Sequence, residues 1–222
     1  MTNSPPRQLA RLLQLASPVL PVGAFSYSQG LEAAVEAGDV TDAASARAWI
    51  EDVLAFSIAR MEAPVLLRMC AACVDGDAAG LVQWNETFLA SRETAELRAE
   101  TVQMGYSLAR LLPDLDVEVT DCEEISFPAA FAHAVAAWRI DPQEALVAYL
   151  WSWAENQVMA ALKAVPLGQT DGQRMLLALG EQVEAVAAEA RSLTDDELGN
   201  FAPGLALASA RHETQYSRLF RS

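Results

Sequence analysis

The side chains in this sequence that are best suited to chemistry are its histidines and cysteines. His133 and His212 could each assist a serine or cysteine nucleophile, and Cys70 and Cys73 have the C-x-x-C spacing of redox and metal motifs. His133, however, lies in an alanine-rich apolar stretch, and no serine lies in a nucleophile-elbow sequence. The pattern therefore predicts no catalytic triad and favours a protein that is not an enzyme.

The cysteine pair is also a weak candidate for a metal or redox site. A zinc site needs a second ligand pair and a thioredoxin-like motif needs a strand–helix–strand setting, and neither accompanies Cys70 and Cys73. With Cys122 they make 3 cysteines, too few for a disulfide framework in a chain of 222 residues. We interpret them as helix-packing thiols and predict no metal or cofactor, with metal binding by Cys70 and Cys73 as the open alternative.

A glycine-containing turn at residues 168–172 is the most distinctive local feature. No Gly-Lys-Ser/Thr follows it and no predicted strand precedes it, so it is not a phosphate-binding loop. The turn displays Gln169, Asp171 and Gln173 beside Lys163. These polar groups fit either a simple corner between two helices or a surface that binds a partner.

Two further segments combine aromatic and polar side chains. Phe25, Ser26 and Tyr27 precede Gly30, which fits either a capped helix start or a docking surface with an aromatic anchor. Residues 211–222 hold three arginines on an acidic protein and would by default fray. Their density of aromatic, leucine and arginine side chains instead predicts a tail that docks onto another surface.

Composition excludes several classes of protein. Lysine and arginine number 15 against 30 acidic residues, and the net charge of −15 repels phosphate backbones, so nucleic acid is a poor partner. Hydrophobic residues make up 52% of the chain, which excludes a disordered protein, and no uncharged run is long enough to cross a bilayer. The N-terminus lacks the pattern of a signal peptide, so we expect a cytoplasmic protein without membrane contact.

The elements that must position these residues are helices. Asp141, Pro142 and Glu144 predict a helix start, and the apolar residues that follow lie on nearly every face up to residue 164. A helix that is apolar all round is buried, so this one should be central. Thr170 is expected to cap the next helix.

Caps and prolines predict further boundaries. Ser26 is expected to cap a helix over residues 27–37, and Thr41 or Asp42 to start one that Pro64 kinks or ends. The other predicted helices cover residues 7–15, 65–74, 81–89, 91–112, 127–138 and 170–191.

The helix over residues 91–112 is expected to face Glu96 and Glu100 to solvent. No β-alternation persists along the chain, no long repeat occurs, and no linker divides it. The sequence therefore predicts an all-α fold: a single-domain helical bundle over residues 1–222, with about eight to ten helices around the buried central one.

Three segments together resemble the urease accessory protein UreF family. They are residues 12–32, 163–174 and 211–222, which read LLQLASPVLPVGAFSYSQGLE, KAVPLGQTDGQR and RHETQYSRLFRS. Residues 91–98 and 127–131 are also similar to that family. The resemblance thus covers essentially the whole chain in the family's order.

The resemblance implies a dimeric, non-catalytic chaperone for urease maturation. Such a protein binds a second accessory protein, UreD (also called UreH), and recruits and regulates the GTPase UreG for GTP-dependent nickel insertion into apo-urease. The homodimer contact is implied near Trp151, and the tail would fold onto UreD. The residues implied to bind partners or stabilise the complex are Phe25, Ser26, Tyr27, Gly30, Lys163, Gln169, Asp171, Gly172, Gln173, Arg211, His212, Glu213, Tyr216, Arg218, Leu219 and Phe220.

Two other classes of function stay open from the residues alone. One is a helical enzyme whose acid–base pair would be Glu155 with Lys163 or His133, which needs a pocket with a perturbed titrating group. The other is a binder of a small apolar ligand in a cavity lined by Trp151 and Trp153. A ligand of that kind would stabilise the protein by mass action, whereas a scaffold should respond to protein partners.

Overall fold

The computed structural model describes residues 5–222, and within them the chain contains no strand. Ten α-helices are present in this part of the chain, which confirms the predicted all-α fold. Their bounds are α1 Pro5–Leu15, α2 Leu31–Glu36, α3 Ala43–Val53, α4 Ala63–Asp75, α5 Ala78–Ala90, α6 Ala95–Leu111, α7 Phe127–Trp138, α8 Pro142–Ala164, α9 Gln169–Ser192 and α10 Pro203–His212. Shorter elements are 3₁₀ turns at Ala24–Ser26, Leu112–Leu115 and Asp195–Glu197, and a π-helix at Leu54–Glu62. No helix within residues 5–222 is both long and apolar enough to span a membrane.

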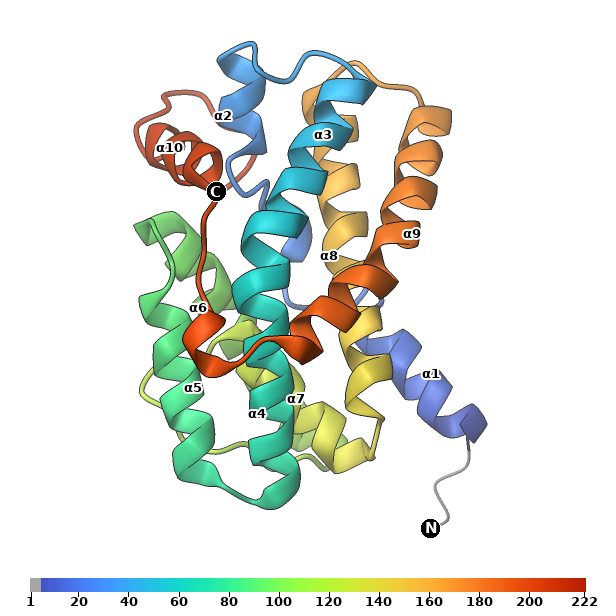
Figure 1. Ribbon diagram of the computed structural model, residues 1–222, viewed down its shortest axis with the longest axis vertical. Coiled ribbons are helices and arrows are strands. Elements are labelled where there is room, and N and C mark those ends of the chain that lie inside the picture. The colour runs from blue at the N-terminus through green and yellow to red at the C-terminus, as the bar shows by residue number, and fades with distance from the viewer. Residues whose placement is uncertain (1–4) are drawn as a thin grey trace.

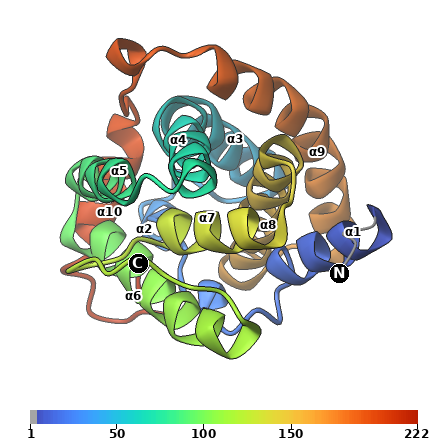
Figure 2. The same ribbon diagram turned by 90° about the horizontal axis from the view of Figure 1, so that it is seen from below.

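Helix α8 runs through the middle of the bundle (Figure 1). It packs against α1, α2, α3, α4 and α9, and α9 returns antiparallel to it after the turn at residues 165–168. Helix α7 packs on both α4 and α6, and α5 lies at the opposite edge from α9 (Figure 2). The predicted central helix is thus confirmed.

The sequence of α8 explains both its start and its burial. Asp141 Oδ1 accepts the backbone N–H groups of Gln143 (2.9 Å) and Glu144 (3.2 Å), which caps the helix. Most of its apolar side chains are buried against the five neighbouring helices. Three of its apolar side chains stay exposed, namely Val147, Trp151 and Met159.

The prediction that a helix begins directly after Ser26 is wrong. After one 3₁₀ turn the chain becomes extended, and α2 begins only at Leu31. The cause is the backbone of Gln29 and Gly30, whose φ angles of 52° and 78° lie in the left-handed region and cannot continue a right-handed helix. Residues 23–30 are therefore a loop, which we call the loop before α2.

Pro64 does not end the helix that α3 begins. The π-helix joins α3 to α4, and Pro64, which has no N–H to donate, follows directly after it. The backbone N–H groups of Gly199 and Phe201 donate to the carbonyl oxygens of Arg60 (3.2 Å) and Phe56 (3.1 Å) of the π-helix. Of the predicted kink or end at Pro64, the end is therefore wrong, and α3, the π-helix and α4 form one long column (Figure 1).

The predicted cap of α9 at Thr170 is wrong, because the N-cap residue is Gly168. The side chain of Asp171 accepts the N–H of Gly168 (3.3 Å), which is the acidic half of a capping box. The helix can therefore begin at Gln169, one residue earlier than the predicted cap.

Candidate protein-docking surface

The C-terminal segment (residues 213–222) pairs with the loop before α2. Ser28 N–H donates to the carbonyl oxygen of Ser222 (2.9 Å), and Arg221 N–H donates to that of Ser26 (2.8 Å). These backbone bonds hold the segment against its own chain, so it does not fray. Two of the three motif segments noted in the sequence therefore lie side by side.

Glu32 of α2 is the main anchor of this segment. Its carboxylate accepts the backbone N–H groups of Leu219 (2.7 Å) and Phe220 (2.9 Å) and lies 3.3 Å from Nε2 of His212. His212 is fully buried, and its Nδ1 lies 2.7 Å from a carboxylate oxygen of Glu96. A single buried carboxylate thus pairs with groups from both α10 and the C-terminal segment, as buried polar groups require.

Lys163 joins the third motif segment to this assembly. Its Nζ lies over the rings of Phe25 (5.8 Å to the centroid) and Phe220 (5.6 Å), within the range of cation–π contacts. Phe25 is 64% exposed, Lys163 is exposed, and Phe220 is buried. Residues from all three motif segments therefore meet at the C-terminal end of α8.

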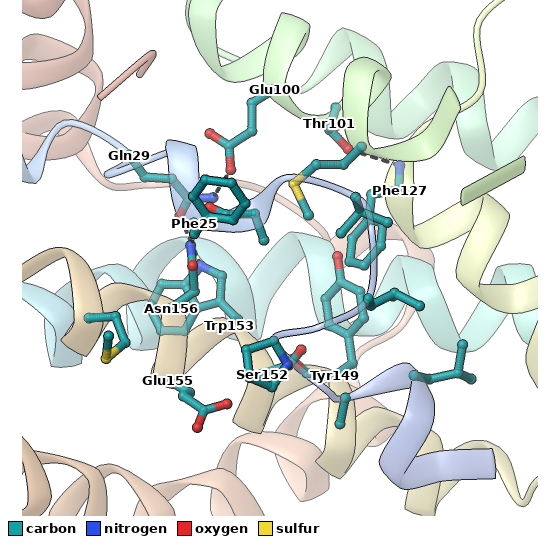
Figure 3. A pocket seen from close by; sticks show the side chains of 18 of the residues that line it. Phe25, Gln29, Glu100, Thr101, Phe127, Tyr149, Ser152, Trp153, Glu155 and Asn156 are labelled. Carbon is teal, nitrogen blue, oxygen red and sulfur yellow. Dashed lines mark hydrogen bonds between the residues drawn. The ribbon is translucent and has the colours of Figure 1, made fainter. Parts of the chain in front are cut away.

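A cavity of about 230 Å³ opens beside Phe25 (Figure 3). Its walls are largely apolar, but Glu62, Arg92 and Glu100 bring charged groups to it. Arg92 Nη1 lies 3.3 Å from the carboxylate of Glu62, and the hydroxyl of Tyr149 donates to the same carboxylate. The cavity thus combines an accessible aromatic side chain, Phe25, with a buried ion pair between Arg92 and Glu62.

Glu100 contradicts the prediction that its helix face is solvated. It is 6% exposed and accepts hydrogen bonds from Gln29 Nε2 (2.8 Å) and Ser222 Oγ (2.8 Å). Burial raises the pKa of Glu100 to about 7, and these two hydrogen bonds partly oppose the shift. Because the folded chain keeps this proton to a higher pH than the unfolded chain, Glu100 favours folding below its unfolded pKa. That contribution is lost as the pH rises through about 7.

Three of the predicted residues support the surface from within. Tyr27, Gly30 and Gly172 are all buried. A Cβ at Gly30 would lie 3.2 Å from the Cβ of Ala208 in α10, so both the left-handed backbone and the close helix favour glycine there. A Cβ at Gly172 would lie 2.8 Å from the side chain of Leu162. These positions fix the geometry of the surface and do not themselves offer contact area.

Other predicted residues lie at the rim or apart from the meeting point. Gln169, Asp171 and Gln173 stand at the start of α9, beyond the turn that follows α8, and the contacts that unite Phe25 with Lys163 do not include them. Trp151 lies 12 residues before Lys163 on α8, roughly 18 Å along the helix. Ser26 is half-buried. Of the predicted residues at the C-terminal end, those that are exposed are Arg211, Glu213, Tyr216, Arg218 and Leu219.

Sequence reasoning missed the polar residues that hold the surface together. Asn156 Nδ2 donates to the carbonyl oxygen of Ala24 (2.8 Å), and Trp153 Nε1 donates to Oε1 of Gln29 (2.8 Å). Both donors come from α8 and fix the loop before α2. Glu32 and Glu100 were missed for a different reason, since acidic residues on amphipathic helices are usually solvated.

The two alternative sites are only partly assembled. Glu155 and Lys163 both line the cavity, but His133 lies in a separate pocket with Cys73. Of the two tryptophans expected around an apolar ligand, Trp153 lines the cavity. The residues of the predicted acid–base pair with His133 are therefore not brought together.

Cys73 and His133 contact each other where α4 packs on α7. Cys73 Sγ lies 3.8 Å from His133 Nδ1, and Thr120 N–H donates to His133 Nε2 (3.2 Å). Burial raises the pKa of the Cys73 thiol to about 11 and lowers that of His133, so both groups are neutral near pH 7. Within residues 5–222 no three or more His, Cys, Asp or Glu side chains are arranged to hold a metal ion.

The fold and the site define an all-helical protein with an exposed aromatic and cationic patch beside a cavity, held by buried hydrogen bonds. A patch of this kind suits the docking of another protein. Comparison with known proteins then gives the family. The UreF family model matches residues 40–180, more than half of the chain. The chain belongs to the UreF family of urease accessory proteins.

Known relatives are similar over nearly the whole chain. Urease accessory protein UreF of Azoarcus sp. (strain BH72) is 60% identical over 96% of this chain and 95% of that protein. UreF of Dechloromonas aromatica (strain RCB) is 56% identical over 97% and 98%. The bifunctional urease accessory protein UreEF of Bordetella bronchiseptica is 52% identical over 97% of this chain, which covers 52% of that protein. These similarities confirm the resemblance found in the sequence and connect the chain to urease maturation.

Proposed function

We propose that this chain is a non-catalytic scaffold for urease maturation that binds UreD/UreH and recruits and regulates the GTPase UreG. The assembled complex would insert nickel into apo-urease at the expense of GTP in the cytoplasm. The observation that carries the proposal is the meeting of Phe25, Lys163 and Phe220, which come from three distant motif segments. A surface assembled in this way depends on the whole fold, as a specific docking site should.

The exposed part of the surface divides naturally between the two partners. Phe25 and Lys163, with the polar residues at the start of α9, would face UreG. Tyr216 and Leu219 are well exposed on the C-terminal segment and would face UreD. Exposed aromatic side chains next to a cavity are typical anchors of protein interfaces. The UreEF relative, whose name joins two accessory designations in one chain, supports a role beside other accessory proteins.

The same proposal includes a homodimer formed through α8. Val147 and Trp151 are exposed apolar side chains one turn apart on this otherwise buried helix. A second copy of the chain would cover these two side chains, with Trp151 as the larger contact. Apolar side chains of this kind are enriched in the cores of homodimer interfaces.

The proposal predicts that Phe25→Ala will weaken the UreG-containing complex by about tenfold or more, because exposed aromatic anchors carry much of the binding energy. Size-exclusion chromatography with light scattering would measure complexes of the chain with UreD and UreG, with and without GTP and Ni²⁺. Phe201→Ala is a matched control, since Phe201 is 77% exposed and lies after α9, outside the motif segments.

A truncation after Ala210 should lose the UreD complex. A wild-type chain that ignores both partners under every condition would contradict the proposal.

A further inference from the structure

The side-chain amide of Gln29 is oriented by its two neighbours (Figure 3). The indole N–H of Trp153 can only donate, and it lies 2.8 Å from Oε1 of Gln29. The amide nitrogen must therefore point the other way, where it lies 2.8 Å from Oε1 of Glu100. This arrangement requires an acceptor on α6, since Gln29 would otherwise bury an unpaired N–H group.

Glu100 also holds the C-terminal segment. Its second oxygen accepts a hydrogen bond from the hydroxyl of Ser222 (2.8 Å), and a main-chain oxygen of Ser222 accepts the N–H of Ser28 (2.9 Å). Because Ser28 precedes Gln29, these bonds close a ring from the loop before α2 to α6, to the C-terminal segment, and back. Ser28 and Ser222 are fully buried. In such a closed network, the loss of one bond weakens the others.

We propose that Glu100 is a positioning residue for the docking surface, because it couples the seating of the C-terminal segment to the conformation of the loop that presents Phe25. The coupling is a property of the isolated chain, and its importance for partners rests on the proposed function. Loss of the Ser222 contact should therefore change the hydrogen bond that the Trp153 indole makes to the other side of Gln29.

The charges around Glu100 make this coupling sensitive to protons. The titratable and charged groups that face it are Glu62 of the π-helix, Arg92 before α6, Tyr149 of α8 and Tyr27 of the loop before α2. Burial and Glu62 raise the pKa of Glu100 and Arg92 lowers it, with a result of about 7. The carboxylate that accepts both bonds therefore becomes dominant as the pH rises through neutrality.

The test follows the indole N–H resonance of Trp153 in protein labelled with ¹⁵N-tryptophan and assigned with the Trp153→Phe variant. In the wild type this resonance should titrate with a midpoint near pH 7. Glu100→Gln keeps an acceptor for Gln29 and a donor for Ser222, so it should preserve the resonance and abolish the titration. Glu100→Leu removes both bonds and should shift the resonance and speed its solvent exchange about tenfold or more.

Ser222→Ala keeps the test informative even if Glu100→Leu fails to fold. It removes one hydroxyl, whose partner is Glu100, and should still shift the Trp153 resonance and weaken UreG binding by about threefold or more. Glu93→Leu is the matched control, because Glu93 is an exposed carboxylate just before α6, and it should change neither readout.

A Trp153 resonance that responds neither to pH nor to Ser222→Ala overturns the coupling. UreG affinity that is unchanged in Ser222→Ala and Glu100→Leu, while Phe25→Ala abolishes it, overturns the positioning role. The resonance needs no partner protein. A chain that shows the predicted shifts but binds neither UreG nor UreD would therefore refute the proposed function and leave the coupling in place.

Discussion

Glu32→Ala is expected to lower the free energy of unfolding by about 3–5 kcal/mol, the usual cost of removing one partner from a buried charged network. The variant leaves the backbone N–H groups of Leu219 and Phe220 without their acceptor and removes one of the two carboxylates beside the buried His212. The C-terminal segment should therefore detach, and the loop before α2 should lose its pairing with it.

Urea denaturation and limited trypsin digestion would measure the two effects of Glu32→Ala separately. Cleavage after Arg218 should become much faster in the variant, because detachment of the segment exposes the neighbouring backbone. Glu36→Ala is the matched control, since Glu36 is an exposed acid one turn later on α2. Equal stability and equal cleavage rates in Glu32→Ala and Glu36→Ala would show that Glu32 does not anchor the segment.

Arg92→Met is expected to destabilise the protein by a similar amount, about 3–5 kcal/mol, because it leaves a buried carboxylate unpaired. The side chains of Arg92 and Glu62 are only 7% and 8% exposed, and they form the ion pair on the floor of the cavity. Methionine fills much of the volume of the arginine stem, so the loss should come mainly from the charge of Glu62 and not from a void.

The double variant Arg92→Met, Glu62→Gln separates charge from packing. It should recover more than half of the stability lost in Arg92→Met, because a neutral amide can still accept the hydroxyl of Tyr149. Chemical denaturation at pH 7 would measure all three proteins. A double variant that is less stable than Arg92→Met alone would mean that the buried pair does not work as a charge pair.

Local sequence signals were sufficient where one residue decides a helix boundary. Asp141 caps α8 as predicted, and Asp42 caps α3 with Ser45 Oγ accepting the N–H of Asp42 (3.1 Å). These bonds join residues two or three positions apart, so the sequence contains all the information that they need. The all-α fold and the central place of α8 follow from the same local patterns.

The buried polar network could not be predicted in this way. Glu100 lies on a helix that also carries the more exposed charges of Arg98 and Arg110. Only contact with Gln29 and Ser222, which are distant in the sequence, makes the burial of Glu100 tolerable. The left-handed backbone of Gln29 costs about 1–3 kcal/mol and persists because Trp153 and Glu100 hold its side chain. Such long-range compensation leaves no mark on local periodicity.

The central claim is that three distant segments form one docking surface, and the most direct measurement is hydrogen exchange with mass spectrometry. The chain would be compared free, with UreD, and with UreD plus UreG and GTP. We predict that the added protection will fall on residues 23–30, 163–174 and 213–222 together. Protection confined to the opposite end of the bundle, around Cys73 and His133, with these three segments unchanged, would contradict the claim.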